Sequence, residues 1–170
     1  MASTFQGIFE NAGTLVSAAE TQTAAYHKIY QQHCHRIYSL AFYMTDNELV
    51  AEQLATNTFL RAFASTTPPG HDQIDQSFLT EVREIMPVGA LSLHLAVAPG
   101  VGRIQGRVQR QLLERAVVAL PPTERLIFLW HEVDGYGHAK ISHLLGLSEQ
   151  ESRFGLHQAR LHVRERVSRM

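Results

Sequence analysis

The stretch that decides the fold is PPTERLIFLWHEVDGYGHAKISHLLGLSEQESRFGLHQARLHVR, residues 121–164. Prolines and glycines divide it into three helical segments. Pro122 lies at the start of the first segment, Gly135 follows its end, and Gly146 ends the second. Proline favours helix starts and glycine favours helix ends. The sequence SEQE at 148–151 has the capping-box pattern that opens a helix. We therefore predict three consecutive helices joined by short turns, which is the arrangement of a helix-turn-helix.

The last of these helices is predicted to have one packed face and one cationic face. Apolar or small residues recur at helical spacing on the first face, and basic residues recur beside them. The packed face is Ser152, Leu156, Ala159, Val163 and Val167, and the cationic face is Arg153, His157, Arg160 and Arg164. DNA phosphate is the commonest anionic partner of such a helix in this architecture. We expect the core beneath it to be Leu126, Phe128 or Leu129, Ile141, Leu144, Leu145, Leu156 and Val163.

This stretch resembles region 4 of the extracytoplasmic-function sigma factors, the small bacterial subunits that direct RNA polymerase to promoters. The resemblance lies in the proline step at 121–122, the apolar rhythm that follows it, LGLS at 145–148 and LHQAR at 156–160. It implies that the helix beginning near Ser148 enters the major groove of the minus-thirty-five promoter element. The DNA contacts predicted on this basis are Ser148, Gln150, Arg153, His157, Arg160 and Arg164.

Residues 30–63, YQQHCHRIYSLAFYMTDNELVAEQLATNTFLRAF, resemble the first half of region 2 of the same family and end in its frequent FLRAF signature. In the family the second helix of this region docks on the clamp helices of the largest polymerase subunit. The resemblance therefore predicts core RNA polymerase as a partner. Its predicted contacts are Glu52, Gln53, Thr56 and Asn57.

Several positions depart from the family pattern. Glu52 is the one acid left in the docking segment, which is usually more acidic. The third helix of region 2 is usually aromatic and then strongly basic, so that it holds the minus-ten element. Here residues 77–97 carry Arg83 as their single cation, and Pro87 breaks the helix. In region 4, Phe154-Gly155 replaces the usual Ser-Arg, and a glycine inside a helix costs about 1 kcal/mol relative to alanine.

Periodicity and punctuation predict an all-α fold of two small helical modules. In the first, helices are expected from Tyr26 to Met44, from about Glu48 to Phe63 and from about Asp75 to Met86. Residues 1–106 hold five basic and nine acidic residues, net -4, whereas residues 107–170 hold ten and seven, net +3. The basic surface therefore belongs to the C-terminal part. The predicted division is a tail or short helix at 1–22, a region 2-like domain at 23–97, a linker at 98–106 and a region 4-like domain at 107–170.

The sequence argues against several other classes of protein. The single cysteine, Cys34, excludes an internal disulfide framework and suits a reducing cytoplasm. Ten histidines invite a metal hypothesis, but His33-Cys34-His35 are consecutive and point about 100° apart on a helix, so they cannot converge on one ion. No nucleophile-base pair, phosphate-binding glycine loop or membrane-spanning apolar run is present in the sequence. We expect a cytoplasmic protein that is not an enzyme and needs no metal or cofactor.

Two functions remain open. The first is a sigma-factor-type transcription initiation regulator that binds promoter DNA and core RNA polymerase. The second is a sigma-like mimic that engages an anti-sigma factor or another regulator without recruiting polymerase. The altered docking segment favours the second, and the retained helix-turn-helix with its arginines favours the first.

Overall fold

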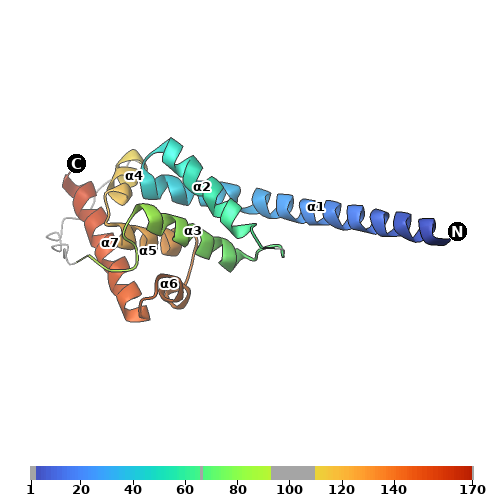
Figure 1. The fold of residues 1–170 in the computed structure, drawn as a ribbon. Helices are drawn as coiled ribbons and strands as arrows, with labels where there is room; N and C mark the ends of the chain where they lie inside the picture. The colour runs from blue at the N-terminus through green and yellow to red at the C-terminus, as the bar shows by residue number, and fades with distance from the viewer. Residues whose placement is uncertain (1–2, 66, 93–109, 170) are drawn as a thin grey trace.

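The computed structural model describes residues 3–65, 67–92 and 110–169, with side chains from residue 21 onward. Every element in these ranges is a helix, so the predicted all-α class is confirmed (Figure 1). We call the first three helices the N-terminal module and the other four the C-terminal module. The N-terminal module is α1 (Ser3–Thr45), α2 (Glu48–Ala62) and α3 (His71–Ile85); the C-terminal module is α4 (Arg110–Val118), α5 (Pro122–Glu132), α6 (His138–Leu145) and α7 (Glu149–Arg169).

The helices of the C-terminal module begin and end where its punctuation predicts. Pro122 is the first residue of α5, as its fixed φ and missing N–H favour. Gly146 ends α6 in the left-handed conformation, φ 74°, which glycine adopts without a Cβ clash. The capping box of α7 is also present. Glu151 N donates to Ser148 Oγ at 3.1 Å, and Ser148 N donates to the Glu151 carboxylate at 2.7 Å.

Two helices of the N-terminal module start earlier than predicted. The helix expected from Tyr26 begins at Ser3, so α1 runs through the predicted tail and projects from the body in Figure 1. A helix can run through that segment because no proline interrupts it, but its weak apolar periodicity did not predict one. The helix expected from Asp75 begins at His71. Its start lacks a Ser, Thr, Asp or Asn cap; instead, Gly70 N donates to Gln73 Oε1 at 2.9 Å.

The core runs through both modules as one cluster of buried side chains. In the N-terminal module α1 packs on α2 and α2 on α3, while α7 packs against α4, α5 and α6. Further contacts join α1 to α4 and α5, and α3 to α6. The predicted C-terminal core is confirmed, with Leu129 buried, Phe128 half-buried, and Val163 packed at the edge. The predicted linker, 98–106, lies outside the described residues. No helix in the described ranges is long and apolar enough to cross a membrane.

Candidate nucleic-acid interface

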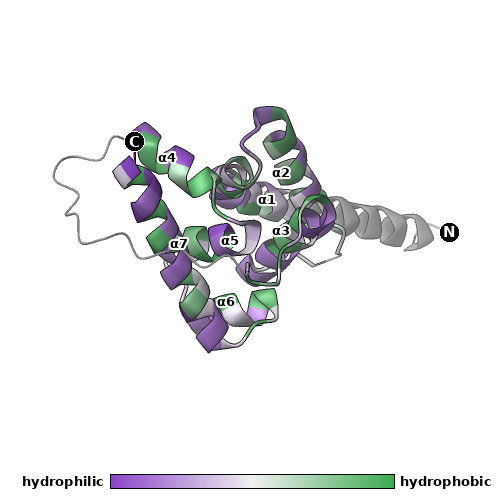
Figure 2. Cartoon of the chain, turned by 90° about the vertical axis from the view of Figure 1, so that its left-hand side faces the viewer, coloured by the Kyte–Doolittle hydropathy of each residue, from purple (hydrophilic) through white to green (hydrophobic). Residues whose placement is uncertain are grey.

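The cationic face predicted on the last helix lies on the outer side of α7. Figure 2 shows hydrophilic and hydrophobic residues alternating along this helix. The hydrophobic ones turn toward the core, where Leu156 and Ala159 are buried. All six side chains predicted to contact DNA are exposed: Ser148, Gln150, Arg153, His157, Arg160 and Arg164. The structure thus brings the predicted contacts together along one helix and its N-terminal cap.

Carboxylates neutralise part of this face. Arg153 pairs with Glu149 of the same helix at 3.5 Å, and Arg160 pairs with Glu132 of α5 at 2.5 Å. Exposed ion pairs of this kind contribute about 0–1 kcal/mol and are screened by salt, so phosphate can compete for both arginines. At the helix start, hydrogen bonds from the Ser148 backbone and hydroxyl lower the pKa of Glu151. Its negative charge therefore stays at the end where base edges would come within reach.

Gly155 has a packing role that the sequence did not reveal. A Cβ added at this position would lie 2.7 Å from Ile127 Cδ1 and 2.8 Å from Leu91 Cδ2. Leu91 belongs to the segment after α3, and it packs against the shared core. The arginine that the family usually carries here would therefore displace Leu91. Gly155 therefore lowers the helix propensity of α7 but allows Leu91, in the segment after α3, to lie close against this helix.

The four predicted polymerase contacts lie on α2, on the far side of the N-terminal module's core. Glu52, Gln53 and Thr56 are exposed, and Asn57 is half-buried. Two large apolar side chains flank them on the same helix, because Leu49 is 77% exposed and Leu60 is 67% exposed. At helical spacing, Leu49, Gln53, Thr56 and Leu60 share one face. The α2 face therefore combines apolar contact area with hydrogen-bonding groups.

Phe78 does not offer a stacking surface to single-stranded DNA. It is completely buried in the core. Arg83, the single cation of residues 77–97, donates from Nη2 to the Leu145 carbonyl of α6 at 3.2 Å. The N-terminal module thus presents neither an aromatic side chain nor an unengaged cation from α3.

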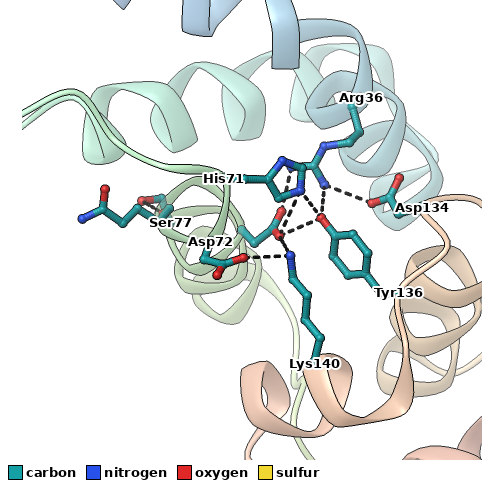
Figure 3. Close-up of polar contacts among 9 residues, drawn as sticks. Arg36, His71, Asp72, Ser77, Asp134, Tyr136 and Lys140 are labelled. Carbon is teal, nitrogen blue, oxygen red and sulfur yellow. Dashed lines mark hydrogen bonds and ion pairs between the residues drawn. The ribbon is translucent and has the colours of Figure 1, made fainter.

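Sequence reasoning missed a polar cluster where the two modules meet. It contains Arg36, His71, Asp72, Asp75, Asp134, Tyr136 and Lys140 (Figure 3). Asp75, which the sequence predicted at the start of a helix, is completely buried. No local pattern could reveal the cluster, because its contacts join residues up to 100 positions apart.

Comparison with known proteins matches the C-terminal module to a family model. Residues 110–163 match the family model described as sigma-70, region 4. The C-terminal module is a sigma-70 region 4 domain. Its helices α4–α7 cover the matched residues, and the cationic face lies on its last helix. No curated protein sequence matches the chain.

Most of the chain has a fold similar to that of a sigma factor of known structure. The match is to RpoE of Bartonella quintana, solved in complex with the anti-sigma factor NepR. Its TM-score is 0.62 at 14% identity, covering 84% of this chain and 96% of that one. The region 4 match and the shared fold both support the predicted resemblance to the sigma-70 family.

Proposed function

We propose that this protein directs transcription initiation by binding promoter DNA through α7 and core RNA polymerase through α2. The observation that carries the DNA part is the exposed row of Arg153, His157, Arg160 and Arg164 on the last helix of a region 4 domain. A net charge of +3 over residues 107–170 is modest, and Glu149 and Glu151 repel phosphate at the helix start. We therefore expect weak DNA binding that depends strongly on salt.

A salt titration with matched variants tests the DNA contact. Arg160→Ala/Arg164→Ala should weaken binding to most sequences alike. It should also reduce the slope of log affinity against log salt by about 0.9 for each of these arginines that neutralises a phosphate. Arg166→Ala/Arg169→Ala is the control, because it removes the same charge from the same helix but from other faces. Equal weakening in the two variants would contradict a specific DNA-binding face.

Base recognition is assigned to the start of α7. Arg153 lies within the first two turns, where a helix in the major groove comes nearest to base edges. Arg153→Ala should therefore change sequence preference more than salt slope. Selection from a random duplex library by the wild type and the variant would measure this. Identical selected sequences would remove Arg153 from the recognition contacts.

The proposed polymerase contact can be tested by pull-down with core enzyme. Leu49→Glu/Leu60→Glu changes the apolar ends of the α2 face without touching the core, since both side chains project into solvent. It should abolish capture of core polymerase. The control is Glu84→Leu/Glu165→Leu, which exchanges the same two residue types on α3 and α7, away from the α2 face. It should leave capture of core polymerase unchanged.

One observation favours a second function, that of a sigma-like mimic. Acidic residues are scarce on the α2 face, where Glu52 is the one that remains. In that case the chain is a mimic that occupies an anti-sigma factor, the class of protein bound to the structurally similar RpoE. Capture of an anti-sigma factor by the wild type, with no capture of core polymerase and no specific DNA binding, would establish this alternative.

A further inference from the structure

Two polar side chains meet inside the helix-turn-helix, between the start of α6 and the start of α7. Ser152 of α7 is completely buried. Its Oγ lies 2.9 Å from Nδ1 of His138, the first residue of α6, whose ring is half-buried. Among the described residues, His138 is the one hydrogen-bond partner of this hydroxyl. Because a buried hydroxyl without a partner destabilises a fold, Ser152 depends on His138.

This hydrogen bond ties the first turn of α7 to α6. Ser152 is the first buried residue of α7, and the next ones are Gly155 and Leu156, about one turn later. Arg153, to which we assign base recognition, follows Ser152 directly in the chain. The position of the Arg153 side chain therefore depends on how the first turn is held against α6.

A second histidine orients the His138 ring. His131, in the last turn of α5, stacks on this ring with 4.8 Å between the centroids and 16° between the planes. Nδ1 of His131 lies 2.8 Å from the Tyr136 carbonyl oxygen. A carbonyl only accepts hydrogen bonds, so Nδ1 of His131 carries a proton and donates it there. The oriented His131 ring in turn restricts how the His138 ring lies against Ser152.

The surroundings of His138 favour its neutral form. Burial is the largest cause that lowers its pKa, and the charges of His131 on α5 and of Arg153 and Arg160 on α7 act in the same direction. Glu149, also on α7, opposes them. The ring is therefore mostly neutral at neutral pH, and one of its two nitrogens is an acceptor. If Nδ1 is that acceptor, it takes the proton of the buried Ser152 hydroxyl, and Nε2 carries the ring proton.

Protonation of His138 would reverse this arrangement. Both nitrogens of a charged imidazole are donors, so Nδ1 would no longer accept from the Ser152 hydroxyl. The buried hydroxyl would lose its acceptor, and a positive charge would appear beside Arg153. Both changes act on the first turn of α7. The rest of the helix stays in place, because Gly155 and Leu156 remain packed against the core.

We propose that His138 and Ser152 position Arg153 for base recognition. The neutral ring holds the first turn of α7 against α6, and its protonation loosens that turn. The protein therefore discriminates between DNA sequences better at neutral pH than in acid. The effect on DNA rests on the proposed function, whereas the hydrogen bond belongs to the free chain and can be tested without DNA.

Nuclear magnetic resonance of the full chain, with nitrogen-15 in its histidine rings, tests the hydrogen bond. At about pH 7.5, Nδ1 of His138 should have the chemical shift of an unprotonated nitrogen, and the pKa of the ring should lie below its ordinary value of about 6.5. Ser152→Ala removes a donor to the neutral ring, so it should raise that pKa. A proton on Nδ1 at about pH 7.5, or no change of the pKa in Ser152→Ala, would overturn the proposal whatever the chain does with DNA.

Sequence discrimination is measured as the ratio of two affinities, one for the duplex that the wild type selects from a random library and one for a shuffled duplex of the same length. The ratio cancels the general gain in phosphate attraction that other histidines bring as they become protonated. For the wild type it should fall about fivefold between about pH 7.5 and about pH 5.5, as expected for the loss of one hydrogen bond. Circular dichroism at both pH values checks that the chain stays folded.

Three variants assign the fall in the ratio to this pair. His138→Asn keeps an acceptor oxygen at the place of Nδ1 but does not titrate, so its ratio should be the same at both pH values. Ser152→Ala should also give a ratio that does not depend on pH, but one below that of the wild type at about pH 7.5. The control is His143→Asn, the same change at an exposed position of α6, which should behave as the wild type does.

The outcomes separate this proposal from the proposed function. An equal fall in the wild type and in His138→Asn would overturn the role of His138, because acid would then act elsewhere. A ratio that does not change with pH in a wild type that binds DNA would also overturn it. No binding to any duplex, together with the expected resonances of the His138 ring, would overturn the proposed function and leave the hydrogen bond standing.

Discussion

The exposed faces of α2 and α7 carry different chemistry, although both helices rest on one continuous core. On α7 the face is a row of three arginines and a histidine. On α2 it is a mixture of amides, a hydroxyl and one acid, with Leu49 and Leu60 projecting into solvent at its ends. A cationic row suits a polyanion, whereas apolar area rimmed by hydrogen-bonding groups suits another protein. This difference supports the proposal that the two modules bind different classes of partner.

The largest effects we predict test whether the two modules unfold together. Phe78 of α3 is completely buried and Leu145 of α6 is 2% exposed. Phe78→Ala should cost about 3–5 kcal/mol and Leu145→Ala about 2–5 kcal/mol. Because the core is continuous, each change should lower the midpoint of one common unfolding transition followed by circular dichroism.

Phe154→Ala is the control for these core substitutions, since Phe154 is 43% exposed and its removal should alter stability by less than about 0.5 kcal/mol. Hydrogen exchange can then assign the effect to each module. If Phe78→Ala left the slowest amides of α5 and α7 unaffected, the two modules would unfold separately. In that case the continuous core would not couple the unfolding of one module to that of the other.

A smaller effect is expected at the helix starts, where the two modules use different caps. Asn47 Oδ1 accepts a hydrogen bond from Val50 N at 3.1 Å at the start of α2. Ser148 belongs to the reciprocal box of α7, in which the Glu151 carboxylate also accepts from Ser148 N. Asn47→Ala and Ser148→Ala should each destabilise the protein by about 1 kcal/mol, measured by urea unfolding.

Asn47→Asp and Ser148→Thr are the controls for the caps, because each keeps an acceptor oxygen and should retain most of the stability. The Ser148→Ala effect should be the more local of the two. The Glu151 carboxylate keeps its bond to the backbone N–H of residue 148, so α7 should fray at one N–H group only. A much larger loss of stability at Ser148 would mean that the cap also positions α6 against α7.

The difference between the modules also explains how far the sequence could predict them. The C-terminal boundaries follow from local signals: Pro122 fixes a start, Gly146 fixes an end, and the box at 148–151 fixes the next start. The cationic face follows from helical periodicity alone. In the N-terminal module, Gly70 gives no side-chain cap and residues 3–25 contain no stop, so both early starts escaped prediction.

The junction escaped prediction for another reason. Asp75 and Lys140 are ordinary surface residue types, and each finds its partners on helices that are distant in sequence. From the sequence, Gly155 only lowers the helix propensity of α7. The packed helices show why it is needed, because Leu91 and Ile127 occupy the space that a Cβ would fill. Tertiary contact between the modules determined these features, and local propensity did not.

The smallest effect we predict concerns pH and the histidines near the junction. His33 contacts the His71 ring at 4.9 Å between centroids, and the His71 ring nitrogen lies against Tyr136 OH. Burial is the largest cause that lowers the pKa of His33, and the charges of His71 and Arg36 add to it. Burial also lowers the pKa of His71; Arg36 and Lys140 act in the same direction, and Asp75 opposes them.

A histidine with a lowered pKa in the native state takes up its proton more readily when unfolded. Stability is therefore greatest above the unfolded value of about 6.5, and it is lost as the pH falls from there through the native pKa. The free energy of unfolding should therefore decrease as the pH falls below about 7. His33→Gln/His71→Gln should flatten this dependence, whereas His27→Gln/His35→Gln, at exposed positions of α1, should not. An increase in stability on acidification would mean that attraction to Asp72 and Asp75 exceeds the cost of burial. In that case, protonation would tighten the contact between the modules.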